Sequence, residues 1–292
     1  MRAQRIDITE DDYHADKLPD WCTGPSLSNS MAKILLDKSP AHAYAAHPKL
    51  GGAGRVLPAS TLATFDAGKL AHKLLLGRGA EVVVIDGEDW RSKEAREARD
   101  EAREAGKIPT LRGAYDTAVT AADIVRGKLA HMGIDLDGHS EVQLAWQENP
   151  SDPIWCRGML DHLRIGDGRA TIFDLKTTRD AKPMSASHSI VRYGYDTQRA
   201  AYSRAVESLL GIGCRAIDFV FIFAETVPPF AVTAGRLDDV LVARGEERWN
   251  QAIDLWARCL RADHWPEYAN TLVQFEAPPW MSGDIEIGFE EE

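Results

Sequence analysis

The sequence has few cysteines, and none of them lie close together. Cys22, Cys156, Cys214 and Cys259 are spread over 292 residues, and no C-x-x-C pair occurs. Structural zinc sites and iron–sulfur clusters need cysteines at short spacings, so this distribution disfavours both. We expect reduced, partly buried thiols, as in most cytosolic proteins.

Long apolar runs are missing as well. No stretch approaches the roughly 20 apolar residues that cross a bilayer, and residues 1–20 lack the apolar region of a signal peptide. The composition, 44% hydrophobic and 27% charged, is that of a globular protein, and the length allows a sizeable core. We therefore expect a cytoplasmic protein of one or two domains.

Positive charge is scarce, because 34 Lys and Arg stand against 45 Asp and Glu, a net charge of -11. This balance argues against nucleic-acid binding. The segment from Arg157 to Arg204 is the exception, with nine Lys and Arg against five Asp and no Glu. It can hold a phosphate backbone locally, although ordinary charge fluctuation explains it equally well. Residues 284–292 carry five acids and no base.

Periodicity and turn signals predict an α/β protein. Helices are expected over about 28–47, 60–77, 88–107, 114–131, 196–210 and 237–262, the first capped by Ser28 or Ser30 and broken at Ser39-Pro40. Strands are expected over 80–86, 140–147, both sides of 166–168, and 216–225. We divide the chain into a turn-rich lead-in (1–25), a single domain (26–265) and a Pro/Trp-containing acidic tail (266–292).

One predicted hairpin, residues 158–178, carries an unusual set of charges. Asp167-Gly168 is a favoured pair for a two-residue type I′ turn. This turn places Asp161 directly opposite Asp174 on the neighbouring strand, with Cβ atoms about 5 Å apart. Strand alternation adds Lys176 to the same face, whereas the residues between these positions point into the core.

Two facing carboxylates repel each other and should destabilise the hairpin. A cation between Asp161 and Asp174 removes that repulsion, and carboxylate oxygens suit Mg²⁺ or Mn²⁺. A neighbouring Lys176 can hold a water or neutralise charge on a phosphate. The pattern therefore indicates metal-assisted hydrolysis of a phosphodiester, with an Asp/Lys pair on a surface hairpin as the alternative.

These residues also form a motif that resembles the PD-(D/E)xK nucleases. Gly158-x-x-Asp161 is followed, after twelve residues, by Asp174-Leu175-Lys176, and then by Gln198-x-x-x-Tyr202. The last motif, together with His72 on the predicted 60–77 helix, is similar to the RecB-like branch. Residues 13–42 and the Ala/Glu/Arg helix resemble the phage and prophage group typified by RecE, exodeoxyribonuclease VIII. The resemblance spans roughly residues 13–265 and implies a restriction-endonuclease-like core, a central mixed sheet flanked by helices, with N-terminal helical decoration.

The resemblance also implies a metal site. Asp161 and Asp174 would bind the catalytic Mg²⁺, for which Mn²⁺ is expected to substitute. The backbone carbonyl of Leu175 and the side chain of His72 would be further ligands. Glu141, which faces away from the apolar side of its strand, is one more candidate ligand or an ordinary exposed strand residue.

The remaining motif residues would serve catalysis in such an enzyme. Lys176 would position the attacking water, and Gln198 and Tyr202, one helical turn apart, would line the site and contact DNA. Alternatively, His72 is an ordinary helix histidine and Tyr202 is plain core.

The function implied is a Mg²⁺-dependent 5′-to-3′ exonuclease on linear double-stranded DNA ends, acting in phage or prophage recombination. A ring-like homo-oligomer and a single-strand annealing (RecT-like) partner are implied as well. A non-catalytic DNA-binding module on a nuclease fold is the rival. A CRISPR-adaptation-type nuclease is a second rival, which the missing close cysteines disfavour. No G-x-x-x-x-G-K-[ST] helicase motif is present.

Overall fold

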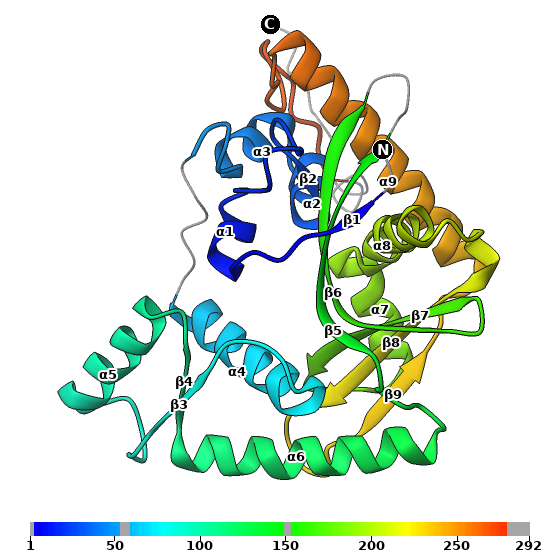
Figure 1. The fold of residues 1–292 in the computed structure, drawn as a ribbon. Coiled ribbons are helices and arrows are strands. Elements are labelled where there is room, and N and C mark those ends of the chain that lie inside the picture. The colour runs from blue at the N-terminus through cyan, green and yellow to red at the C-terminus, as the bar shows by residue number, and fades with distance from the viewer. Residues whose placement is uncertain (1–2, 53–58, 149–152, 279–292) are drawn as a thin grey trace, which may run out of the picture.

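A seven-stranded mixed sheet forms the centre of the computed structural model, which describes residues 3–52, 59–148 and 153–278 (Figure 1). The strand order is β1-β5-β6-β7-β8-β9, and β2 pairs with β6. The pairs β2/β6 and β7/β8 are parallel, and the others are antiparallel. The strands are β1 (Gln4–Arg5), β2 (Leu27–Ser28), β5 (His139–Glu148), β6 (Ile154–Gly166), β7 (Arg169–Thr178), β8 (Ile217–Glu225) and β9 (Val232–Gly235).

Helices cover both faces of this sheet and bury its apolar residues (Figure 1). The larger core packs α2 (Asn29–Asp37), α3 (Pro40–Ala46), α8 (Tyr195–Leu210) and α9 (Asp239–Ala262) against one face. The smaller core packs α4 (Ala59–Leu76) and α6 (Arg112–His131) against the other. Because β8 is sandwiched between these layers, its residues from Phe219 to Ala224 are all apolar and buried.

Local signals set the boundaries of several elements as predicted. Ser28 caps α2, Ser39 caps α3 with Pro40 at its first position, and Gly77 follows the end of α4. At the hairpin turn, Asp167 and Gly168 both have positive φ, as a type I′ turn requires. The thiols of Cys22, Cys156 and Cys259 are free and buried, as expected.

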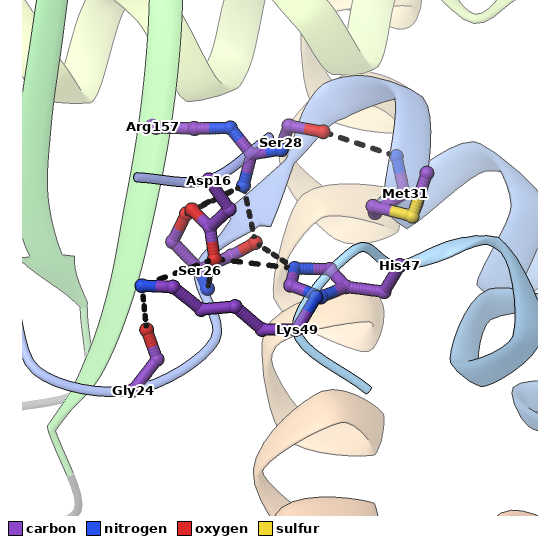
Figure 2. A network of polar contacts seen from close by, with 8 residues as sticks. All are labelled: Asp16, Gly24, Ser26, Ser28, Met31, His47, Lys49 and Arg157. Atoms are coloured by element: carbon purple, nitrogen blue, oxygen red, sulfur yellow. Dashed lines mark hydrogen bonds and ion pairs between the residues drawn. The ribbon is translucent and has the colours of Figure 1, made fainter. Parts of the chain in front are cut away.

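The N-terminal segment is more ordered than the predicted turn-rich lead-in. Its strand β1 pairs with β5, and α1 (Glu10–His14) follows with Tyr13 buried. Figure 2 shows how the segment is pinned: Arg157 Nη1 of β6 bonds Asp16 Oδ1 at 2.8 Å and Ser26 O at 2.9 Å. His47 bonds the same Ser26 carbonyl. This fixation depends on partners far along the chain, so local sequence gave no sign of it.

The short strands β2 and β9, strand β4 and helix α7 were not predicted either. Strand β4 (Ile108–Leu111) pairs in parallel with β3 (Val82–Ile85), and together with α5 (Lys93–Glu104) they extend away from the main sheet (Figure 1). Helix α7 (Pro183–Tyr193) fills the segment between β7 and α8. Both segments are short, and their apolar positions contact neighbours distant in sequence, which periodicity alone does not reveal.

Some predictions lie outside the described residues, namely most of the 148–153 loop and the acidic end of the tail. In the part of the chain that is described, no helix combines the length and apolarity needed to cross a membrane.

Candidate active site

The candidate site lies where β6 separates from β7. The predicted hairpin register is confirmed from Gly166↔Arg169 to His162↔Phe173, but the ladder ends there. Asp161 and Asp174, predicted to be the next direct pair, are therefore not part of the regular ladder. Instead, Leu175 N–H donates to Asp161 Oδ2 at 2.7 Å. The Asp161 carboxylate thus accepts the hydrogen bond that the Leu175 N–H would donate to the backbone of β6 in a regular ladder.

Helix α4 reaches the same point from the side of the smaller core. His72 Nε2 lies 3.2 Å from Leu175 O, and its Nδ1 lies 3.7 Å from Asp161 Oδ1. Both backbone groups of Leu175 are therefore occupied by side chains from other elements, His72 from α4 and Asp161 from β6. The His72 and Asp161 side chains are 25% and 17% exposed, so solvent reaches the site along this edge.

Glu141 on β5 lies beside Asp161. It occupies the position between the pairs Ser140↔His162 and Val142↔Leu160, which aligns it with Asp161, and its φ is +52°. A residue other than glycine in this conformation is uncommon and marks local distortion of the strand. Burial raises the pKa of Glu141, and Glu10 and Asp161 raise it further.

On the other side of Leu175, Asp174 and Lys176 form a closed polar ring with Gln198 of α8. Lys176 Nζ lies 2.6 Å from Asp174 Oδ2 and donates to Gln198 Oε1 at 3.2 Å. Gln198 Nε2 in turn donates to Asp174 Oδ1 at 2.7 Å. The Asp174 side chain is 1% exposed and that of Lys176 is 17% exposed. The Asp174-Leu175-Lys176 motif thus contacts Gln198 of the second predicted motif, although 22 residues separate Lys176 from Gln198.

Burial has opposite consequences for the two charges in this ring. Burial raises the pKa of Asp174 to about 6, because attraction to Lys176 only partly offsets the loss of water. Burial alone would lower the pKa of Lys176, but attraction to Asp174 and Asp161 outweighs it, and the pKa is raised. Lys176 therefore stays protonated at neutral pH, but its charge does not fully compensate for the burial of the Asp174 carboxylate.

Tyr195 is a site residue that the sequence analysis missed. Its ring centroid lies 4.3 Å from Lys176 Nζ, a cation–π contact, and it stacks on Phe221 of β8. Tyr195 precedes Gln198 by three residues, so both lie on one side of α8. That helical spacing was the available signal.

Tyr202 packs on β6, the strand that carries Asp161. Its ring packs on Gly158 so closely that a Cβ added there would stand 2.6 Å from Tyr202 Cε1. Gly158 is therefore needed for close approach of strand and ring. Tyr202 is buried, and burial raises its pKa well above the usual range. The motif's tyrosine supports the strand that carries Asp161.

A divalent metal at this site would be held by Asp161, His72 and the carbonyl of Leu175. Adjacent ligands of an octahedral Mg²⁺ stand about 3 Å apart, and the 3.2 Å between His72 Nε2 and Leu175 O is close to this value. The carboxylate and carbonyl oxygens suit Mg²⁺ or Mn²⁺, whereas the imidazole of His72 is a ligand more typical of the later transition metals. Over the described residues, no cluster of three or more His, Cys, Asp or Glu is preassembled, because Asp174 pairs with Lys176 and Gln198 instead.

An apolar cavity of about 360 Å³ lies behind the site, on the other face of β7. Ala67 and Ala71 of α4, Ala118 of α6, and Leu175 and Thr177 are among the residues that line it. None of the polar side chains of the site opens into this cavity, so the chemistry belongs to the edge described above.

Comparison with known proteins identifies the architecture. A family described as a PDDEXK-like domain of unknown function (DUF3799) matches residues 28–276. No curated protein matches the chain. A candidate exonuclease from Eubacterium rectale has a similar structure, with a TM-score of 0.60 and 11% identity over 96% of this chain and 100% of that one. This likeness shows the fold, and with the family match it confirms the predicted PD-(D/E)xK-type core.

A phage-related exonuclease from Haemophilus somnus 129PT is also similar, at 14% identity over 70% of this chain and 84% of that one. Its TM-score of 0.29 is too low to support an argument.

Proposed function

Because the chain belongs to the PDDEXK-like DUF3799 family, we propose that it is a metal-dependent nuclease that hydrolyses DNA phosphodiesters. The observation that carries the proposal is the convergence of Asp161, Asp174, Lys176 and His72 on Leu175, at the split between β6 and β7. A domain that only binds DNA has no use for a buried carboxylate whose ionisation is unfavourable. This cost is what argues against the non-catalytic alternative.

Each side chain has a distinct task in the proposed hydrolysis. Asp161, His72 and Leu175 O hold the metal, with Asp174 and Glu141 as further candidate ligands. When bound, the metal supplies Lewis-acid polarisation of the phosphate and a water of lowered pKa. The Lys176 ammonium, held by Asp174, Gln198 and the Tyr195 ring, donates to the attacking water or to a non-bridging phosphate oxygen. Attack opposite the leaving oxygen then breaks the phosphodiester.

The finer assignment is a 5′-to-3′ exonuclease of RecE type on linear duplex ends, with Mg²⁺ as the metal and Mn²⁺ as a substitute. It follows from the resemblance of motifs, as do the ring-like homo-oligomer, the RecT-like annealing partner, the cytoplasmic location and the phage or prophage origin. The absence of a close cysteine group supports this assignment over a CRISPR-adaptation-type nuclease.

Digestion of labelled linear and circular duplex DNA, with Mg²⁺ or with a chelator, tests the proposal. We expect linear DNA to be digested only when metal is present and circular DNA to stay intact. A label at the 5′ end should be released before a label at the 3′ end. Asp161→Ala and Lys176→Ala should lower the rate at least 100-fold. Asp218→Ala is the matched control, because Asp218 lies on β8 of the same sheet and its removal breaks an ion pair with Arg236 outside the site. Full activity in Lys176→Ala would contradict the proposed chemistry.

A further inference from the structure

Helix α7 presents an exposed face to which the helix itself contributes no acid. Residues 181–195 contain no Asp or Glu, in a chain with 45 acids. Met184, His188 and Val191 share one exposed side of the helix, and Arg192 lies next to it. Asp180, the nearest preceding acid, is engaged by Lys182 N and Ser185 Oγ. We refer to Met184, His188, Val191, Arg192 and Tyr193 as the α7 surface.

The guanidinium of Arg192 is available for an anion. It makes no ion pair with any residue that the structure describes, and its side chain is exposed. Lys33 of α2 donates from Nζ to Arg192 O at 3.0 Å, but its charge is paired with Asp37 at 2.7 Å, so Arg192 carries the unpaired charge here. The Arg192 guanidinium lies 5.7 Å from the centre of the Tyr193 ring. An unpaired guanidinium is suited to a phosphate, which it can bind through two N–H groups.

Apolar and aromatic side chains are exposed on the same surface. Met184 is 68% exposed, Val191 44% and Tyr193 46%. Side chains of this kind contact the faces of bases, and every base can stack on a tyrosine ring. A duplex hides its base faces within the stack, so exposed rings and aliphatic groups favour an unpaired strand over a duplex.

Aromatic contacts connect this surface directly to the candidate active site. The Tyr193 ring lies 5.7 Å from the Tyr195 ring, centroid to centroid, and the Tyr195 centroid lies 4.3 Å from Lys176 Nζ. Tyr193 is therefore within about 10 Å of the Lys176 ammonium. At the 3.4 Å rise per nucleotide of a strand in a stacked duplex, this span corresponds to at most about three nucleotides, and an extended single strand covers it with fewer. Figure 1 shows α7 next to α8, the helix that carries Tyr195 and Gln198.

We propose that the α7 surface binds the single-stranded segment of the DNA substrate next to the scissile phosphate. Tyr193 stacks on a base within about three nucleotides of the cleaved bond, Arg192 binds a phosphate, and Val191 and Met184 contact further bases. The inference rests on the proposed nuclease function and adds to it that a duplex end is unpaired over up to about three nucleotides. A protein partner is less well matched, because the surface adjoins the candidate active site and residues 181–195 carry no acid.

Fluorescence anisotropy with a labelled single-stranded oligonucleotide, in chelator to prevent cleavage, tests this assignment. Tyr193→Ala should weaken binding roughly 5- to 100-fold, the range expected for loss of one stacked base. Tyr193→Phe should bind like the wild type, because the ring face is kept. Arg192→Ala should lower the slope of log K against log salt by about 0.7, the contribution of one phosphate on a single strand.

Matched controls separate this surface from general effects of charge and aromaticity. Arg258→Ala removes an exposed arginine of α9, and Tyr268→Ala removes a tyrosine exposed beyond the end of α9. Neither should change affinity or salt slope. Unchanged binding in both Tyr193→Ala and Arg192→Ala, or equal loss in the controls, would overturn the inference. Digestion by the wild-type protein tests the nuclease function separately, so the two failures are distinguishable.

Discussion

Replacing the buried Asp174 by Asn should stabilise the metal-free protein while it abolishes the proposed activity. The pKa of Asp174 is raised from 3.8 to about 6, and each unit corresponds to about 1.36 kcal/mol between protonation states. At pH 8, the ionised carboxylate therefore costs about 3 kcal/mol, and a neutral amide avoids this cost. The amide of Asn would place one N–H against a donor of Lys176 or Gln198, and this unfavourable contact would reduce the gain by about 1–2 kcal/mol. A net gain of about 1–2 kcal/mol remains.

The gain should depend on pH with a defined sign. An acid whose folded pKa is raised binds its proton more tightly in the folded state. Asp174 therefore costs nothing below about pH 4, and its cost grows between pH 4 and 6 and is constant above. Thermal unfolding in chelator should show Asp174→Asn above the wild type by about 2–3 °C at pH 8. At pH 5 the two melting temperatures should nearly coincide, because the cost of the carboxylate is then about half and the unfavourable donor contact of Asn offsets it.

A matched substitution gives the opposite sign. Asp218 on β8 has a lowered pKa because Arg236 donates to it, so Asp218→Asn should lower or leave unchanged the melting temperature at pH 8. Millimolar Mg²⁺ should raise the melting temperature of the wild type more than that of Asp174→Asn. A variant at position 174 that is less stable than the wild type at pH 8, or a gain that does not change with pH, would refute the reasoning.

Three further substitutions test the packing around the site. Gly158→Ala forces a Cβ into the ring packed on that strand and should cost about 1–3 kcal/mol in urea unfolding, whereas Gly127→Ala, in open space on α6, should not destabilise. Tyr195→Leu removes the cation–π contact and should lower kcat, while Tyr195→Phe should keep it, in steady-state digestion assays. Arg157→Met removes the shortest ion pair of the buried Asp16 carboxylate and leaves Lys49 at 3.7 Å, so it should cost up to about 3 kcal/mol, with partial recovery when Asp16→Asn is added, both measured by denaturant unfolding.

The PD-(D/E)xK-type fold was predictable because its signals are local. A two-residue turn at Asp167-Gly168 and the alternation of strands fix which residues share a face. The capping serines and Gly77 likewise act within one turn of their helices. The register through His162↔Phe173 was correct for this reason.

The geometry of the site was less predictable. The facing pair of Asp161 and Asp174 was expected from regular pairing, but β6 leaves β7 one residue earlier, and Asp161 bonds Leu175 N–H. Nothing in the hairpin sequence announces this separation, because the groups that make it possible include His72, more than a hundred residues away along the chain.

The sequence by itself determined which chemistry is present: two aspartates and a lysine on one hairpin, with a histidine, a glutamine and a tyrosine on helices. Tertiary structure alone decided how they are used. It turned Asp174 toward Lys176 and Gln198, placed Tyr195 over the ammonium, and moved Tyr202 beneath Gly158. The reason is physical: periodicity records which side of an element a residue faces, whereas burial, ring contacts and pKa shifts depend on the elements that pack against it.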